Sequence, residues 1–165
     1  MNKLRLLLAF LLIAISGFIT PAQSYAAATK DDRTYDQNIQ VNYAALQKAG
    51  QNLNKIKNDV PALTVSASSL EYKSWEKKVL SAYRAMAIPV SALAKLRASP
   101  GFKTSDAKLK TSMAAWMKII TYVKREGNTT DPSKKAASQK LNDVADTTLE
   151  EWSRAYAADV AALNR

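Results

Sequence analysis

Asp143, Asp146 and Glu150 are carboxylate residues that could act together in binding or catalysis. Steps of three and four residues place them on one face of a helix, with Glu151 beside them. Such a stripe could bind a hard cation or supply an acid–base pair. A cation such as Ca²⁺ needs about six or more oxygens that converge, and an acid–base pair needs a carboxyl group in a cleft that raises its pKa. The sequence signals neither arrangement. We therefore expect a solvated helix face, no metal site and no catalytic residue.

The chain contains no cysteine and no histidine. Their absence excludes zinc sites built on these residues, thiol chemistry, Ser-His nucleophiles and His-ligated haem. No phosphate-binding or dinucleotide-binding glycine motif is evident either. The sequence therefore favours a protein that is not an enzyme and needs no cofactor.

Lysines at a predicted helix start form a second group with a possible binding role. Lys134 and Lys135 follow Asp131 and Pro132, a pair typical of the first positions of a helix. Each cation in the first turn opposes the helix dipole by about 0.3 to 1 kcal/mol. The same position suits an anion, because free backbone amides point towards it. A solvated, screened surface is the simpler interpretation, and both remain open.

Four amphipathic helices would position these residues. The first carries Thr34 and Gln37 as a capping box and ends at Pro61; the second opens with Ser68 and Glu71 and ends at the Ser-Pro-Gly sequence of residues 99–101. The third begins near Ser105 and ends at Gly127, which we expect to be a left-handed cap. The fourth runs from Pro132 to the end of the chain. This pattern predicts an all-α, up-down-up-down antiparallel four-helix bundle. A three-helix bundle with a loosely packed first helix is the alternative.

The apolar residues of each helix recur at steps of three, four and seven, which is typical of a buried stripe. We expect the structural core to contain Trp75, Trp116, Trp152, Tyr83, Leu46 and Leu53. An aromatic-lined cavity for a small molecule is the alternative use of the tryptophans. Pro89 lies inside the second helix, where it removes one amide donor, and so predicts a kink there.

The topology gathers positive charge at one end of the bundle. The ends of the first and third helices and the starts of the second and fourth would meet there. Ten cationic residues at this end against Asp59, Glu71, Glu76, Glu126 and Asp131 leave a net charge of +5. The cationic residues are Lys55, Lys57, Lys73, Lys77, Lys78, Lys124, Arg125, Lys134, Lys135 and Lys140. All except Lys55 and Lys57 are our candidate residues for binding an anionic partner.

Residues 1–28 have the pattern of a secretory signal peptide. A positive end with Lys3 and Arg5 precedes an apolar run of about 10 to 14 residues, shorter than the roughly 18 that span a membrane. Small residues permit cleavage after Ala26 or after Ala28. An uncleaved membrane anchor is the alternative. Removal of the segment lowers the formal charge from +10 to +8, because Lys3 and Arg5 are lost, and leaves residues 29–165 as a single domain.

These features together predict an exported, non-enzymatic binding or interaction protein of the cell envelope or periplasm. Its basic end would attach to an anionic envelope polymer, a lipid surface or an acidic protein. Nucleic acid is disfavoured, because no exposed aromatic array alternates with the lysines. A small-molecule carrier or sensor with an aromatic interior is the alternative function. The sequence assigns no oligomeric state.

Overall fold

The computed structural model describes residues 27–59, 68–127 and 132–164. These residues form four long helices, α2 (Lys30–Asn58), α3 (Leu70–Ala94), α4 (Lys103–Glu126) and α5 (Pro132–Leu163), and a short 3₁₀ turn, η1 (Pro100–Phe102). No strand occurs within these ranges, so the predicted all-α class is confirmed. The predicted signal peptide lies outside the described residues except for its last two positions, Ala27 and Ala28.

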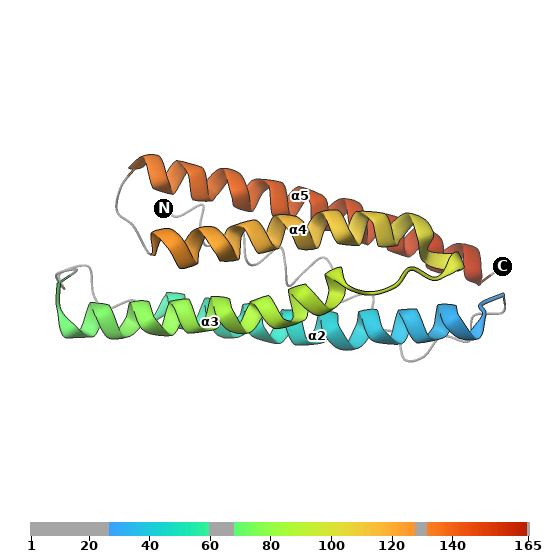
Figure 1. Cartoon of the computed structure of the whole chain (residues 1–165), viewed down its shortest axis with the longest axis horizontal. Helices are drawn as coiled ribbons and strands as arrows, with labels where there is room; N and C mark the ends of the chain where they lie inside the picture. The colour runs from blue at the N-terminus through green and yellow to red at the C-terminus, as the bar shows by residue number, and fades with distance from the viewer. Residues whose placement is uncertain (1–26, 60–67, 128–131, 165) are drawn as a thin grey trace.

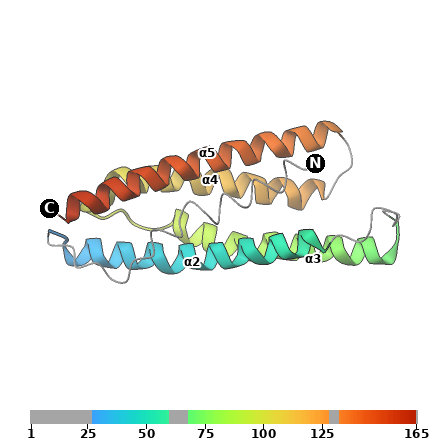
Figure 2. The ribbon, with the colours of Figure 1, turned by 180° about the vertical axis from the view of Figure 1, so that it is seen from behind.

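The four helices pack in two layers. α2 and α3 lie side by side in one layer, and α4 and α5 form the other (Figures 1 and 2). α4 and α5 are the most closely packed pair, and α3 packs against α4 to join the layers. The first helix, α2, packs along α3, so the alternative of a loosely packed first helix is wrong.

The core lies between these layers and uses the predicted stripes. The six residues expected in the core are all buried: Trp75, Trp116, Trp152, Tyr83, Leu46 and Leu53. Val144, an apolar residue of the last helix, is by contrast 48% exposed. Its neighbour Ala145 is fully buried and, with Leu149 and Trp152, forms the face of α5 that meets the core.

Two of the predicted helix starts were wrong by one or more residues. α2 begins at Lys30, because Thr29 and Asp32 form the capping box; the Thr29 hydroxyl accepts a hydrogen bond from the amide of Asp32. Thr34 therefore lies inside the helix and donates to the carbonyl of Lys30. α3 begins at Leu70, because the hydroxyl of Ser69 accepts from the amide of Tyr72 and acts as the cap. The predicted start of α5 at Pro132 agrees with the structure.

The connection between α3 and α4 also differs from the prediction. α3 ends at Ala94, before the Ser-Pro-Gly sequence, which instead forms the turn η1. This turn presses Gly101 against α2 and α5: a Cβ atom at Gly101 would lie 2.8 Å from Oδ1 of Asp32 and 2.9 Å from Cδ2 of Leu163. A larger residue at position 101 would have to displace the buried side chain of Asp32 and that of Leu163, so the packing favours glycine. Phe102, which follows, is fully buried and joins the core.

Pro89 and Gly127 are the two positions where the backbone was expected to be unusual. α3 is one helix from Leu70 to Ala94 and passes through Pro89, which is buried. Gly127 has a φ of 67° and a ψ of −161°. The positive φ agrees with the prediction of a glycine cap, but the ψ places Gly127 outside the left-handed helical region. Its amide donates to the carbonyl of Val123 and closes the last turn of α4.

Candidate functional site

One end of the molecule, which we call the basic pole, brings the predicted cationic residues together. It is formed by the ends of α2 and α4 and the starts of α3 and α5, on the left in Figure 1. Nε1 of Trp75 donates to the carbonyl of Ile56 at 2.8 Å and joins α3 to α2. The Tyr122 hydroxyl donates to the carbonyl of Lys134 at 3.0 Å and joins α4 to α5. These contacts join the helix ends in two pairs, and both pairs lie at the same end of the molecule in Figure 1.

Three of the cations at the basic pole have partners. Glu126 accepts from Nε of Arg125 at 2.6 Å and from Nζ of Lys134 at 2.8 Å. These hydrogen bonds, that from Lys134 first, lower the pKa of Glu126 below its usual value. Nζ of Lys57 donates to the hydroxyl of Tyr83 at 2.8 Å. The predicted binding residues Arg125 and Lys134 are therefore partly neutralised by one carboxylate.

The remaining lysines of the basic pole are exposed and form no ion pair with a described residue. They are Lys55, Lys73, Lys77, Lys78, Lys124, Lys135 and Lys140. The first turn of α5 contains no acidic residue, so Lys135 is not offset within it, whereas Lys134 is paired with Glu126 of α4. Among the described residues, this end therefore presents a cluster of solvated positive charge.

The opposite end, which we call the carboxylate pole, contains buried acidic residues that the sequence analysis missed. Its carboxylates are Asp32, Asp36, Asp106 and Asp159, supplied by α2, α4 and α5. The first three are only 2%, 5% and 4% exposed. Thr29 and Asp32 match the capping-box spacing, so this pair was available as a signal. Nothing in the sequence pattern marked the other three, because their partners come from distant parts of the chain.

The carboxylates of Asp32 and Asp159 bind backbone amides at this pole. Oδ1 of Asp32 accepts from the amide of Gly101 at 2.8 Å, and Oδ2 accepts from the amide of Thr29 at 2.9 Å. Burial raises the pKa of Asp32, but the hydrogen bonds from Thr29 and Gly101 outweigh it and lower that pKa below its usual value. Asp159 reaches from α5 to the amide of Ser105 at 2.9 Å and caps α4, whose own N-cap residue is a phenylalanine.

Asp106 and Asp36 bind tyrosine hydroxyl groups. The Tyr35 hydroxyl donates to Oδ1 of Asp106 at 2.9 Å, and Lys110 forms an ion pair with Oδ2 of the same residue. Burial, reinforced by Asp106, raises the pKa of Tyr35. Asp36 accepts from the hydroxyl of Tyr156 and from the amide of Gln40. Each of these four carboxylates thus has partners, which makes the group a structural network that joins α2, α4, α5 and the turn η1.

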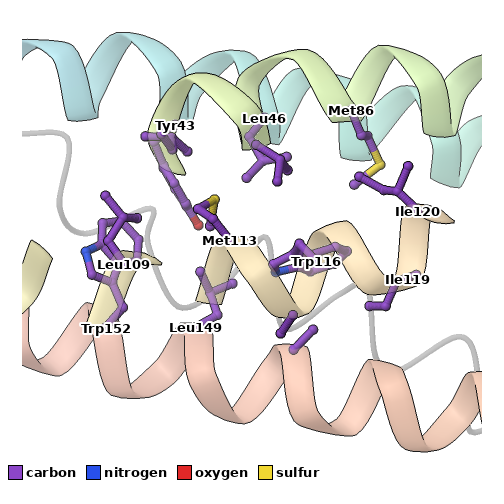
Figure 3. Packing of buried hydrophobic residues seen from close by; sticks show 14 of the residues in the cluster. Tyr43, Leu46, Met86, Leu109, Met113, Trp116, Ile119, Ile120, Leu149 and Trp152 are labelled. Atoms are coloured by element: carbon purple, nitrogen blue, oxygen red, sulfur yellow. The ribbon is translucent and has the colours of Figure 1, made fainter. Parts of the chain in front are cut away.

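The middle of the core contains polar atoms without partners. Within the described structure, the Tyr43 hydroxyl, the Ser112 hydroxyl and the indole nitrogens of Trp116 and Trp152 are buried and form no hydrogen bond. Trp75 differs, because its indole nitrogen is bonded to Ile56. Figure 3 shows Tyr43 entering the core from α2 and Trp116 from α4, with Met113 between them.

The predicted acidic stripe lies along α5. Asp146 is half-buried, and burial, followed by the charges of Asp143 and Glu150, raises its pKa to about 6. Glu151 pairs with Lys108 at 2.7 Å, and Glu150 lies 3.5 Å from Arg154. Across the described ranges no cluster of acidic residues could hold a metal ion.

No helix within the described ranges is both long and apolar enough to cross a membrane. Comparison of the chain with known protein families, with curated proteins and with solved structures finds no match. The contacts and charges described above are therefore the basis for any functional proposal.

Proposed function

We propose that this chain is an exported, non-enzymatic binding protein that attaches to an anionic envelope polymer, a lipid surface or an acidic protein through the basic pole. One observation carries the proposal. Seven lysines of this pole are exposed without an ion pair among the described residues, whereas the four carboxylates Asp32, Asp36, Asp106 and Asp159 of the opposite pole are all bonded. A partner with repeated negative charges would find the larger group of unpaired cations at this end. Near the other described helix ends, beside the bonded carboxylates, the exposed cations without an ion pair are Lys30, Arg33, Lys95, Arg97 and Lys103.

The energetics of such a surface favour an extended, highly charged partner. A single exposed ion pair contributes at most about 1 kcal/mol. Several lysines acting together against one polyanion give a useful attraction, which salt weakens because the Debye length is about 8 Å at physiological ionic strength. The attachment is therefore expected to depend steeply on salt.

The test is a pelleting experiment with purified mature protein, isolated envelope material and vesicles of anionic or neutral phospholipid. Four exposed lysines of the basic pole are reversed in one variant: Lys77→Glu, Lys78→Glu, Lys135→Glu and Lys140→Glu. A matched control reverses four exposed lysines elsewhere: Lys30, Lys48, Lys95 and Lys103. We expect binding at low salt that high salt abolishes, that the control largely keeps and that the pole variant loses. No binding at low salt, or equal loss in both variants, would contradict the proposal.

We also propose that the four helices form an up-down-up-down bundle and that α3 bends at Pro89. The antiparallel order is supported by the contacts that join the end of α2 to the start of α3 and the end of α4 to the start of α5. The bend is supported by the amide donor that Pro89 lacks. Because the chain has no native cysteine, pairs of introduced spin labels can test both features. Labels at Asp31 and Arg97 should be close, and labels along α3 should report its bend.

We propose that export removes the N-terminal segment, with a retained membrane anchor as the alternative. Cleavage after Ala26 would keep two contacts of the folded domain. The amide of Ala27 donates to the carbonyl of Leu163 at 3.1 Å, and the Ala28 side chain is buried. Cleavage after Ala28 would remove both contacts. The intact mass of the exported protein distinguishes the two cuts, and a retained Met1 would support the anchor.

A second candidate function, a carrier or sensor of a small molecule, is favoured by the unpartnered polar atoms of the core. A core that serves packing alone usually satisfies its buried polar groups. Tyr43, Ser112, Trp116 and Trp152 depart from this rule together, around the middle of the bundle. Screening of small apolar molecules by thermal shift tests this function, and a protein that none of them stabilises would count against it.

A further inference from the structure

The buried polar atoms of the core that lack a partner can each donate a hydrogen bond, but no acceptor among the described residues lies within reach. Tyr43 is 5% exposed and Trp116 is 6% exposed, so neither reaches bulk water with its polar atom. An indole N–H can only donate, and a hydroxyl can donate as well as accept. Leaving such groups unpaired in the core is unfavourable, and native proteins rarely do so without a bound water or ligand.

The geometry directs two of these donors at the same region. Long side chains on a helix lean towards its N-terminus, so Trp116 lies over the preceding turn, which carries Ser112 and Met113. Figure 3 shows its indole nitrogen on the side that faces Met113, and the Tyr43 hydroxyl reaching from α2 to the same methionine. Leu46 and Leu149 supply apolar surface in the same view. Met113 is fully buried and unbranched, the kind of side chain that adapts to a guest.

We propose that Tyr43 and Trp116 are the polar contacts of an internal site for a small, uncharged, largely apolar molecule that carries a carbonyl oxygen. The proposal rests on the carrier function above and names its ligand class. A carbonyl oxygen has two lone pairs and can accept from both donors at once. The molecule must be uncharged because the buried members of the core cluster around it are hydrophobic, and a charge there would lack a counter-ion.

The backbone arrangement offers a place where the core can admit such a molecule. The pairs α2–α3, α3–α4 and α4–α5 are closely packed, but α2 and α5 are not packed closely along their backbones. These two helices meet through large side chains instead, such as the rings of Tyr43 and Trp152, whose centroids are 5.2 Å apart. Rotation of one aromatic ring would open this side without separating a close helix pair.

The test uses two probes that share a ring skeleton, 9-fluorenone with one carbonyl group and fluorene with none. The purified protein is titrated with each while the three tryptophan indole N–H signals are followed by NMR. We expect fluorenone to shift the Trp116 signal and to leave the Trp75 signal in place, because that group is already bonded to Ile56. Tyr43→Phe should fold normally, since its hydroxyl has no protein partner, and should weaken fluorenone binding about 2- to 10-fold.

The controls separate this inference from the carrier function itself. Tyr122→Phe, at the basic pole, should bind fluorenone as the unchanged protein does, and Tyr43→Phe should not alter fluorene binding. If both probes bind equally well and Tyr43→Phe affects neither, the carrier function stands and the carbonyl site is overturned. If neither probe binds and a crystal structure shows only water at these donors, both proposals are overturned.

Discussion

The two poles of this bundle differ in the residues that lie beside the free backbone groups at their helix ends. At each pole, two helices begin and two end, so free amides and free carbonyls meet. The carboxylate pole satisfies the amides with buried aspartates, as Asp32 does for Gly101 and Asp159 for Ser105. Lysines occur at helix starts of both poles, but Lys30 and Lys103 share the first turns of α2 and α4 with acidic residues, whereas no acidic residue occupies the first turn of α5 beside Lys135.

Under the function proposed above, the difference separates a region shaped for stability from one available for binding. Carboxylates near helix starts are favoured by the helix dipole, and burial strengthens their hydrogen bonds. Lysines near a helix start oppose the same dipole. The lysines near the start of α5 therefore make the folded protein less stable than acidic residues would. The same lysines would attract a polyanion, as the proposed function requires.

The largest effect is expected at Asp32. Asp32→Ala removes the capping box of α2 and leaves the amide of Gly101 unpaired, so we expect the free energy of unfolding to fall by about 3 kcal/mol. Chemical unfolding followed by circular dichroism measures it. Asp31→Ala, the exposed neighbour in the same turn, is the control and should change stability by less than about 1 kcal/mol. Equal effects at both positions would show that the network of the carboxylate pole is not special.

Removing one tyrosine hydroxyl group at each pole compares how much the hydrogen bonds of the two poles contribute to stability. Tyr35→Phe removes a buried hydrogen bond to the Asp106 carboxylate and should lower the free energy of unfolding by about 2 kcal/mol. Tyr122→Phe removes a half-buried hydrogen bond to the carbonyl of Lys134 and should lower it by about 1 kcal/mol or less. Thermal unfolding of the two variants checks the order. A larger loss for Tyr122→Phe would reverse our ranking of the poles.

Charge changes in the first turn should act in opposite directions at the two poles. Lys135→Glu places an anion at the start of α5 and should raise the free energy of unfolding by about 0.3 to 1 kcal/mol. Asp31→Lys makes the mirror change at the start of α2 and should lower it by a similar amount. Both effects should shrink in high salt. A loss of stability in Lys135→Glu at low salt would mean that the basic pole is not electrostatically strained.

The last prediction concerns Asp146, which lies between the poles. Its pKa in the folded protein is about 6, above its usual value of 3.8, so the protonated form is favoured by folding. The contribution of Asp146 to stability therefore improves as the pH falls through 6 towards 4 and is lost as the pH rises again. Asp146→Asn should remove this part of the pH dependence in unfolding experiments between pH 4 and 7. Parallel curves for the variant and the unchanged protein would refute the raised pKa.

Local patterns were sufficient for the helices and their buried faces, and insufficient for the carboxylate pole. The spacing of Trp75, Trp116 and Trp152 predicted burial, because helical periodicity is a property of neighbouring residues. The partners of Asp106 and Asp36 are Tyr35 and Tyr156, far away in the sequence. Such pairs leave no periodic signal. The error at Thr34 had a local cause, since the Thr29 and Asp32 capping box competed with the predicted one.

The sequence by itself determined the helical class, the approximate helix ends, most core residues and the excess of lysine near four helix termini. These follow from periodicity, caps and composition, which act over a few residues. The sequence did not predict which charges are paired, which buried donors lack acceptors or how closely other residues approach position 101. Those depend on side chains that meet across the bundle. The close approach of Asp32 and Leu163 to Gly101 exists only after the chain has folded.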